Sequence, residues 1–199
     1  MSEALYIALI HYPVLNKEGE LITTSVTNLD LHDIARTART YGVAGYFVVT
    51  PIEGEQALIE TVLGHWKEGA FGGSYNPDRK EALSLISLKN SLAEVVSEIK
   101  EREASDPYLV ATSARKVSGL DRLDPALLFS RLSELKRPGL VLFGTGHGLA
   151  EGVFSESESI FPPIFGPLGE GGYNHLSVRS AVAITLDRIS NGRSGSTPL

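Results

Sequence analysis

A glycine-rich stretch in the second half of the chain has the residue types and spacing that best suit the binding of a small molecule. Residues 139–150 read GLVLFGTGHGLA, an apolar run followed by glycines that alternate with Thr145 and His147. This pattern predicts a buried strand that ends in a loop whose backbone closely approaches another group. In an open α/β sheet, ligands bind at such a position, just beyond the carboxyl end of a strand.

The glycine loop does not match the common catalytic and nucleotide-binding motifs. GTGHGL lacks the Gly-Lys-Ser/Thr of a P-loop, and its spacing differs from the dinucleotide fingerprint. It has Thr and His where a nucleophile elbow needs one central serine. A Ser/His/Asp hydrolase would have to use Ser113 or Ser177, and no spacing supports either residue. His147 and His175 have no carboxylate at ligand spacing, so no metal site is predicted.

Size and composition restrict the class of protein. The chain has 199 residues, 42% of them hydrophobic, which predicts one globular domain with a substantial core. It contains no cysteine, which excludes disulfides, thiolate metal sites and a cysteine nucleophile. The net charge of −6 argues against binding of nucleic acid by bulk electrostatics, although a local basic patch stays open. No apolar run reaches the ~18–20 residues of a membrane span, and the N-terminal residues lack signal-peptide features, so a cytoplasmic protein is expected.

Apolar runs alternate with helical patterns along the chain, which predicts an α/β fold with a parallel sheet covered on both faces. Strands are expected at residues 4–11, 43–50, 82–88, 107–112 and from 139 onward. Helices are expected from Thr27 or Asn28 to Gly42, and at residues 53–67, 91–103, 125–135 and 176–189. Residues 16–20 and 69–79 are predicted to be loops, and the polar, glycine-rich residues 191–199 a flexible tail.

Six motifs accompany FGTGHGL in order along the chain: HYPVLNKEG, TSVTNLDLHDIARTARTYGV, HW, YNPDR, TSAR and YNHLSVRSA. Together they resemble the SPOUT class of S-adenosylmethionine (SAM)-dependent RNA methyltransferases, the SpoU/TrmD superfamily. Within that class they look like a small bacterial family of predicted methyltransferases with the α/β-knot fold. The resemblance runs from about residue 5 to residue 190, so a single SPOUT domain over residues 1–190 is expected.

The resemblance implies a specific architecture and cofactor site. In SPOUT folds the last helix and its preceding loop pass through an earlier loop, forming a deep trefoil knot at the C-terminal end. SAM is bound bent in that knot, and the class is homodimeric. The glycines would let main-chain amides reach the cofactor. The residues implied to bind the cofactor come from three loops: Thr112, Ser113, Ala114, Phe143, Gly144, Thr145, Gly146, Gly148, Leu149, Ile164, Gly166, His175, Leu176, Val178, Ser180 and Ala181.

The resemblance also implies which residues face the methyl acceptor. In the SpoU branch an arginine in an Asn-x-(several)-Arg-Thr-Ala pattern approaches this site, and NLDLHDIARTA supplies Arg36. Asn28 fits less well, because its spacing to Arg36 is longer by two. Asn174 and Ser177 complete the implied catalytic set, although YNHLSV has one residue more than the usual N-x-S and its Asn-His pair is closer to the TrmD branch. The proton acceptor is left open.

Basic residues around these loops could contact the phosphates of an RNA substrate, tRNA or rRNA. The residues expected to do so are Arg39, Arg115, Lys116 and Arg179. In the simpler alternative such residues are surface charges, and Arg36 pairs with Asp30 or Asp33. His11, His32, His65 and Trp66 are expected to pack or cap, although Trp66 could also stack a base.

The leading functional hypothesis is methyl transfer from SAM to an RNA base or ribose, with guanine N1 of tRNA as one candidate. Two alternatives stay open from the sequence. The first is a non-catalytic SAM-binding sensor or scaffold, and the second is a methyltransferase that acts on protein.

Overall fold

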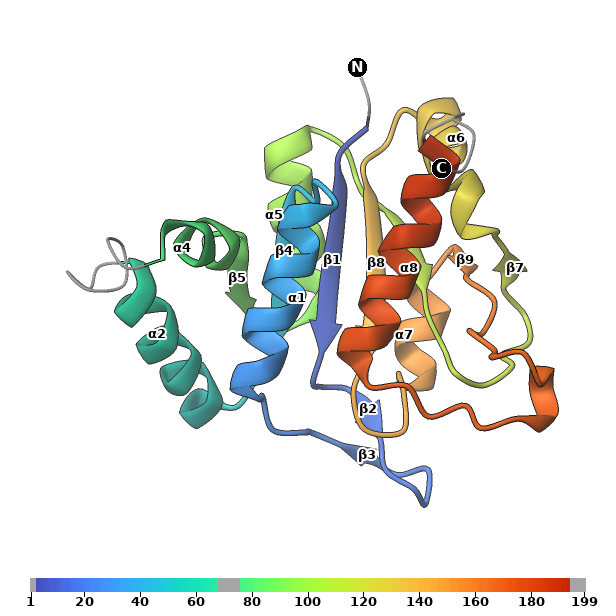
Figure 1. The fold of residues 1–199 in the computed structure, drawn as a ribbon, viewed down its shortest axis with the longest axis horizontal. Coiled ribbons are helices and arrows are strands. Elements are labelled where there is room, and N and C mark those ends of the chain that lie inside the picture. Colours follow the sequence, from blue (N-terminus) through green and yellow to red (C-terminus); the bar gives the residue numbers. More distant parts are fainter. Residues whose placement is uncertain (1–2, 68–75, 194–199) are drawn as a thin grey trace.

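A seven-stranded sheet forms the centre of the computed structural model, which describes residues 3–67 and 76–193 (Figure 1). Its strands are β1 (Leu5–Ile10), β4 (Gly45–Val49), β5 (Ile86–Lys89), β6 (Tyr108–Ala111), β7 (Asp121–Arg122), β8 (Gly139–Gly144) and β9 (Ser159–Ile160). They all run parallel, in the order β5-β4-β1-β8-β6-β9-β7. A separate antiparallel hairpin consists of β2 (Val14–Leu15) and β3 (Leu21–Ile22).

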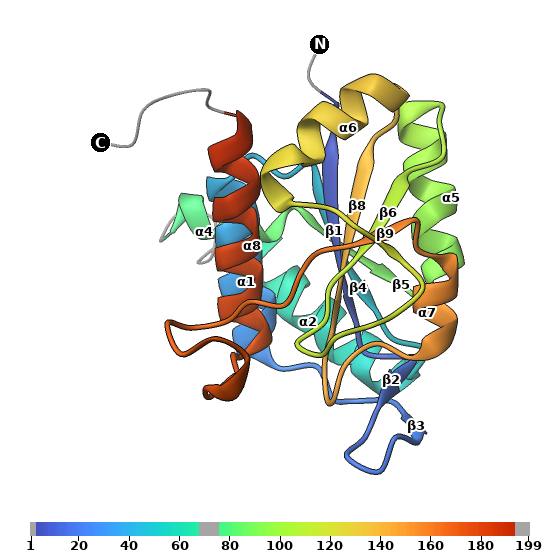
Figure 2. The same ribbon diagram turned by 90° about the vertical axis from the view of Figure 1, so that its right-hand side faces the viewer.

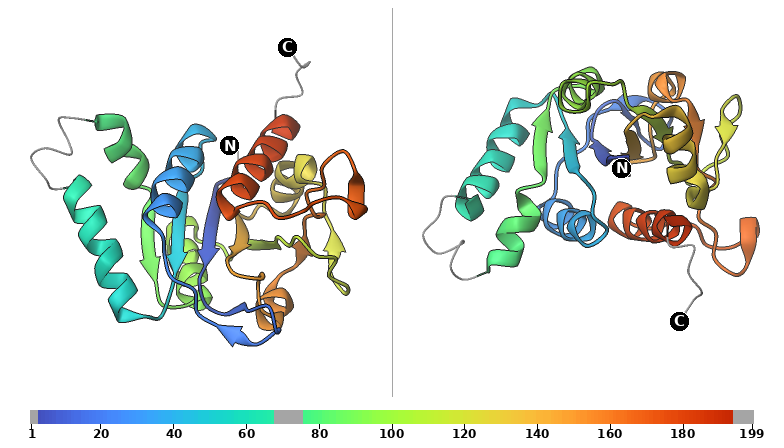
Figure 3. Two further views of the ribbon diagram at one scale, coloured as in Figure 1. Left: turned by 60° about the horizontal axis from the view of Figure 1, so that its bottom comes forward. Right: turned by 90° about the horizontal axis from the view of Figure 1, so that it is seen from above.

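Helices cover both faces of the sheet, as predicted. They are α1 (Asn28–Thr40), α2 (Glu53–Lys67), α4 (Pro77–Leu83), α5 (Leu92–Glu103), α6 (Leu128–Leu135), α7 (Glu151–Glu156) and α8 (Val178–Arg193). In Figure 2 the sheet separates α1 and α8 from α5 and α7, and the view from above in Figure 3 shows the same layers. None of the helices within residues 3–67 and 76–193 has both the length and the apolar character needed to cross a membrane.

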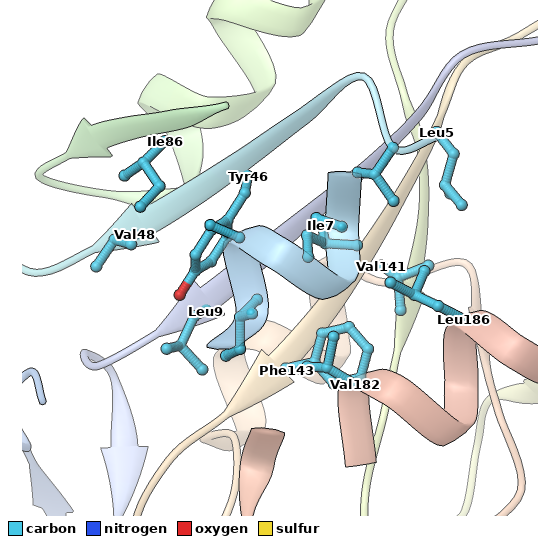
Figure 4. Packing of buried hydrophobic residues seen from close by; sticks show 14 of the residues in the cluster. Leu5, Ile7, Leu9, Tyr46, Val48, Ile86, Val141, Phe143, Val182 and Leu186 are labelled. Atoms are coloured by element: carbon cyan, nitrogen blue, oxygen red, sulfur yellow. The ribbon is translucent and has the colours of Figure 1, made fainter. Parts of the chain in front are cut away.

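The alternation of side chains along β1 divides the core between the two faces. Leu5, Ile7 and Leu9 pack with residues of α1, α2, α4, α6 and α8 on one face (Figure 4). The intervening Tyr6, Ala8 and Ile10 pack with residues of α5 and α7 on the other face. A strand buried on both sides must be apolar at every position, which explains why these strands appear in the sequence as continuous apolar runs.

Capping side chains set the start of two helices. Thr27 is the N-cap of α1, and its Oγ1 accepts a hydrogen bond from the backbone N–H of Asp30 at 3.2 Å. Ser91 caps α5 in the same way through the N–H of Glu94, at 3.3 Å. Gly42 follows α1 with φ of +68°, a conformation that favours glycine. The structure therefore confirms the helix that was predicted to start at Thr27 or Asn28, with Thr27 as the cap.

Two boundaries differ from the sequence prediction around α4. The loop expected over residues 69–79 is wrong from Pro77 onward, where α4 begins, and residues 69–75 lie outside the described part of the chain. Asn76 caps this helix by accepting from the N–H of Arg79 at 3.0 Å, and Pro77 occupies the first helical position that proline favours. The strand expected from Ala82 starts only at Ile86, because Ala82 and Leu83 belong to α4.

Short elements and the end of the chain account for the remaining differences. The β2–β3 hairpin, β7 and β9 have two residues per strand, too few to give a period-2 pattern. The tail expected at residues 191–199 is wrong for residues 191–193, which belong to α8, and residues 194–199 lie outside the described part.

The order of the strands reverses at β1 and β8. From β1 the sheet extends to β4 and β5 on one side, and the later strands β8 and β6 lie on the other side. The carboxyl ends of β1 and β8 therefore lie at the point where connections leave in opposite directions. Such a point leaves a crevice, which is where α/β sheets bind ligands.

Candidate functional site

A cavity of about 810 Å³ lies next to this point, beyond the carboxyl ends of β8 and its other neighbour β6. Its volume lies within the usual range for small-molecule sites. All three loops singled out in the sequence contribute to it, although they are far apart along the chain. Their lining residues are Thr112, Ser113, Ala114, Arg115, Phe143, Gly144, Thr145, Gly146, His147, Gly148, Ile164, Asn174, His175, Leu176, Ser177, Val178 and Ala181.

Three residues that the resemblance implied for cofactor binding are not part of this lining. Leu149 is 1% exposed and pairs with Val14 of the hairpin, so it supports the loop from beneath. Gly166 lies on the exposed loop before α8. Ser180 is in the first turn of α8, with its Oγ 3.0 Å from the Oγ of Ser177.

The glycines of the loop after β8 have different physical roles. A Cβ on Gly144 would lie 2.7 Å from the backbone N of Leu149, so no side chain fits there. Gly146 and Gly148 have φ values of +57° and +108°, which L side chains rarely adopt. A Cβ on Gly146 would also lie 2.9 Å from the carbonyl oxygen of Leu15. The expectation of unusual backbone conformations and close approach is confirmed at these positions.

A chain of hydrogen bonds anchors this loop to the end of β1. The Oγ1 of Thr145 donates to the carbonyl of Ile10 at 3.1 Å, so its only hydroxyl proton is used there. Thr24 must then donate to Thr145 across the 2.5 Å between their hydroxyl oxygens. His11 in turn must donate from Nδ1 to the hydroxyl of Thr24, at 3.1 Å. This assigns the Nδ1–H tautomer to His11.

In that tautomer the other ring nitrogen of His11, Nε2, has no proton. His11 is fully buried, and its Nε2 has no hydrogen-bond partner among the described residues. Burial lowers the pKa of His11, and the nearby Asp30 carboxylate opposes this shift without reversing it. His11 is thus a neutral packing residue, as expected, and it supports Thr24, whose hydroxyl bonds directly to Thr145 on the other side of the cavity.

A further wall of the cavity was not predicted. The loop between β3 and α1 and the first turn of α1 contribute side-chain oxygens from Thr24, Ser25, Thr27 and Asp30. One sequence signal could have indicated this wall, namely the Thr27-x-x-Asp30 helix start, which places a carboxylate at the end of a helix. The other lining residues outside the predicted set are Phe161, Pro162, Phe165, Glu170 and Thr185.

The carboxylate of Asp30 is held by two donors. Its Oδ1 accepts from Nη1 of Arg179 at 3.1 Å, and its Oδ2 accepts from Oγ1 of Thr27 at 2.6 Å. Nε of Arg179 also lies 3.5 Å from Oδ2 of Asp33. Arg179, rather than Arg36, is therefore the ion-pair partner of these two carboxylates.

Two contacts join the loop after β6 to the loop before α8. Nδ2 of Asn174 donates to the carbonyl of Ala114 at 3.1 Å. Nζ of Lys116 lies 2.9 Å from Oε1 of Glu170, an ion pair between exposed side chains. Ser177 accepts from the N–H of Ser180 at 3.3 Å, so it caps the first turn of α8 in addition to lining the cavity.

The predicted substrate-facing basic residues are spread over the surface. Arg36 is exposed on α1, outside the cavity lining, and Arg39 pairs with Glu81. Arg115 lines the cavity and also a second hollow of about 750 Å³ beside the β2–β3 hairpin, which Lys116 lines too. The expected contacts of these residues to RNA stay predictions.

Trp66 packs against the core, as expected, within a polar and aromatic cluster. The rings of His32 and His65 each lie 5.6 Å from its ring, and the guanidinium of Arg79 lies 5.0 Å above it. Burial, followed by the charge of Arg79, lowers the pKa of His32. Within the described residues, no group of His, Asp or Glu side chains is arranged to hold a metal ion.

A model of the family described as "SAM-dependent RNA methyltransferase" matches residues 4–191. The chain belongs to this family. The resemblance to SPOUT methyltransferases, and SAM as the cofactor of the family, are thereby confirmed. The family match covers both ends of the sheet and every wall of the cavity.

Curated relatives support the same family. A protein of Nitratidesulfovibrio vulgaris named "tRNA (guanine-N(1)-)-methyltransferase" is 45% identical over 93% of this chain, but the match covers only 41% of that protein. A protein of the same name from Oleidesulfovibrio alaskensis is 43% identical, with the same coverage. The chain thus spans less than half the length of these relatives. An uncharacterized protein of Aquifex aeolicus is 39% identical over 95% of this chain and 89% of its own length.

Solved structures of low sequence identity share the fold. The SpoU methyltransferase AviRb of Streptomyces viridochromogenes, crystallised with AdoMet, superposes with a TM-score of 0.59 at 16% identity, over 99% of this chain and 60% of its own. TrmJ of Z. mobilis superposes with a TM-score of 0.61 at 15% identity, over 100% of this chain and 73% of its own. The α/β architecture with a parallel sheet is therefore that of the SPOUT methyltransferases.

The residues of the cavity fit SAM. Gly144 and Gly146 let the loop after β8 pack closely on itself and on the β2–β3 hairpin, because a Cβ at either position would collide with backbone atoms there, and both glycines line the cavity. Phe143, Phe161, Ile164 and Leu176 supply apolar surface for an adenosine group, and Asp30 supplies a negative charge for a cationic ligand.

Proposed function

We propose that this protein transfers a methyl group from SAM to a nucleotide of tRNA, with guanine N1 as the first candidate position. The observation that carries the proposal is the cavity of about 810 Å³ in which the three motif-bearing loops meet. The family match supports the choice of SAM and RNA. The names of two relatives support tRNA, and because those proteins are more than twice as long as the matched region, the nucleotide must be tested on this chain itself.

Some of the proposed site residues would hold the cofactor, and others would face the methyl acceptor. Backbone groups of residues 112–115 and 143–148, together with the side chains of Leu176 and Val178, would hold SAM. When bound, SAM supplies an electrophilic methyl group on a sulfonium centre. Arg36, Asn174 and Ser177 are the residues proposed to face the acceptor, and Arg39, Arg115, Lys116 and Arg179 those proposed to contact RNA phosphates.

We further propose that residues 1–190 form a single SPOUT domain whose C-terminal segment is knotted. The bond from Asn174 to Ala114 and the ion pair of Lys116 with Glu170 support this, because they hold the segment before α8 against the loop that it would have to cross. The homodimer and the cytoplasmic location expected of such an enzyme belong to the same proposal. Light scattering of the purified protein measures the oligomeric state directly.

Methylation of RNA from a strain that lacks the gene tests the proposed function. The protein is incubated with labelled SAM and that RNA, and the new mark is located by mass spectrometry. We expect a single methylated nucleotide in tRNA, absent from a reaction without the protein.

The other outcomes separate the parts of the proposal. A mark found only in rRNA contradicts the choice of tRNA, and label transferred only to protein contradicts an RNA substrate. Binding of SAM without transfer to either would identify a sensor or scaffold instead of an enzyme. Absence of SAM binding by calorimetry, in a sample that unfolds cooperatively, would contradict the cofactor assignment.

A further inference from the structure

A shielded carboxylate from the start of α1 lies in the wall of the cofactor cavity. The side chain of Asp30 is 9% exposed, whereas that of Asp33, three residues later, is 49% exposed. Asp30 lines the cavity and Asp33 does not. A carboxylate is rarely this buried unless it is paired, and Asp30 is paired with Arg179, which lets a carboxylate lie in the wall of a largely apolar cavity.

The hydrogen bonds of Asp30 fix its orientation and leave room for a ligand. Arg179 and Thr27 each donate one hydrogen bond, to different oxygens of the carboxylate. A carboxylate has about four acceptor sites, so each oxygen can still accept from a group in the cavity. Arg179 is itself held by its second contact, to Asp33.

The other carboxylate in the lining is in a different environment. Glu170 is 62% exposed at its side chain and pairs with Lys116 across the loops. Among the described lining residues, Asp30 is therefore the one carboxylate shielded from water. The guanidinium of Arg179 offsets part of this charge. Little solvent screens the rest, so the carboxylate can still attract a cation bound in the same cavity.

We propose that Asp30 lies beside the sulfonium methyl of bound SAM and accepts the proton released by the methyl acceptor. In this step the acceptor atom forms a bond to the methyl carbon, and the carbon–sulfur bond breaks with its electron pair remaining on sulfur. The proton of the acceptor moves to the carboxylate of Asp30. Thr27 and Arg179 are positioning residues for that carboxylate. The proposal rests on the proposed function, since it needs SAM in this cavity and an acceptor that carries a proton.

Binding of SAM and of its demethylated product S-adenosylhomocysteine tests the placement of Asp30 without any measurement of activity. The product lacks the sulfonium charge and is otherwise the same ligand. Asp30→Asn keeps the shape of the side chain and removes its charge, so we expect SAM affinity to fall about 10-fold and product affinity by less than about 3-fold.

Asp106→Asn is the matched control for this experiment. It removes an equal charge from a side chain that also pairs with a basic residue, Lys100, at 3.1 Å, but lies outside the cavity lining. We expect the affinities of this variant for SAM and for S-adenosylhomocysteine to stay within about 2-fold of those of the unmodified protein. Equal losses of SAM and product affinity in Asp30→Asn would overturn the placement of Asp30.

Single-turnover methyl transfer at saturating SAM tests the proton transfer itself. We expect Asp30→Asn to be about 10²-fold to 10³-fold slower, with a rate that rises with pH as hydroxide replaces the lost base. Asp30→Glu should recover part of the rate, and Asp106→Asn should retain nearly all of it. Thermal unfolding of each variant verifies that it is folded.

The possible failures are distinguishable. An Asp30→Asn variant as fast as the unmodified protein, with the same pH profile, contradicts the role of Asp30 as proton acceptor and leaves the proposed function intact. A protein that binds SAM but methylates no RNA contradicts the proposed function. In that case the affinity ratio of SAM to product still decides whether Asp30 lies beside the sulfonium.

Discussion

Two walls of the cavity are built on different principles. In the glycine wall, residues 112–115 and 143–148, the shape of the loop after β8 depends on positions where a Cβ would collide or φ is positive. The α1 wall, formed by Thr24, Ser25, Thr27 and Asp30, presents side-chain oxygens and a charge. Backbone groups suit a ligand that every member of a family binds, whereas side chains can be exchanged to suit a particular acceptor. We therefore expect changes in the glycine wall to act mainly on cofactor binding, and changes in the α1 wall to lower the rate of methyl transfer more than the affinity for SAM.

The largest expected effect comes from adding one methyl group to the glycine wall. In Gly144→Ala the new Cβ would lie 2.7 Å from the backbone N of Leu149 and 3.0 Å from the carbonyl carbon of Gly148, so the loop must shift. We expect SAM affinity to fall about 100-fold, which is about 2.7 kcal/mol, and stability to fall by about 1–3 kcal/mol. Calorimetry and urea unfolding measure the two quantities.

Gly152→Ala is the matched control for Gly144→Ala. Gly152 lies in α7, and a Cβ there would meet no atom within 4 Å. We expect unchanged SAM affinity and a stability equal to or slightly above that of the unmodified protein, because alanine favours the helix by up to about 1 kcal/mol. If both variants bind SAM normally, the glycine wall does not hold the cofactor.

The difference between the walls also explains how much of the site could be predicted from the sequence. Alternating glycines after an apolar run are unusual, so the residues GTGHGL are enough by themselves to indicate a ligand loop. Thr27 and Asp30 are also ordinary residues for the start of a helix, and they do act as its cap, so their second role in the cavity was not visible.

The α/β fold and its central strands were predicted correctly, and the elements that were missed have similar physical reasons. The central strands could be predicted from long apolar runs such as residues 139–144, because a strand buried on both faces has apolar residues at every position. The hairpin of Val14–Leu15 with Leu21–Ile22 is fixed instead by contacts distant in sequence, such as the bond from the N–H of Leu15 to the carbonyl of Gly148 at 2.9 Å. Asn76 and Pro77 are typical of a turn and also of the start of a helix, and in the structure Asn76 caps α4.

Substitution of Arg36 is expected to have a smaller effect, on the rate of methyl transfer and not on the affinity for SAM. It shares α1 with Asp30 but is exposed and outside the cavity lining. We expect Arg36→Ala to leave SAM affinity within about 2-fold and to slow methyl transfer by about 10-fold to 100-fold, as the loss of one charge-stabilising contact would. Arg131→Ala removes an equally exposed charge on α6 and should leave both quantities unchanged. Equal losses of SAM affinity and rate in Arg36→Ala would assign Arg36 to folding or to the cofactor.

The smallest expected effect concerns His11, which joins the two walls through Thr24 and Thr145. Burial lowers the pKa of His11 in the folded protein below its ordinary value of about 6.5. As the pH falls below about 6.5, the unfolded chain takes up a proton at His11 that the folded chain does not, so the free energy of unfolding decreases. The decrease continues until the folded pKa is reached, with a slope of at most about 1.4 kcal/mol per pH unit.

His11→Asn isolates this contribution, because the amide keeps a donor for Thr24 and cannot be protonated. Between pH 7.5 and pH 5.5, urea unfolding should show less loss of stability in this variant than in the unmodified protein, by at most about 1.4 kcal/mol. His32, whose pKa is also lowered, is present in both proteins and cancels from the comparison. Identical pH dependence in the two proteins would mean that His11 is protonated as easily when folded as when unfolded.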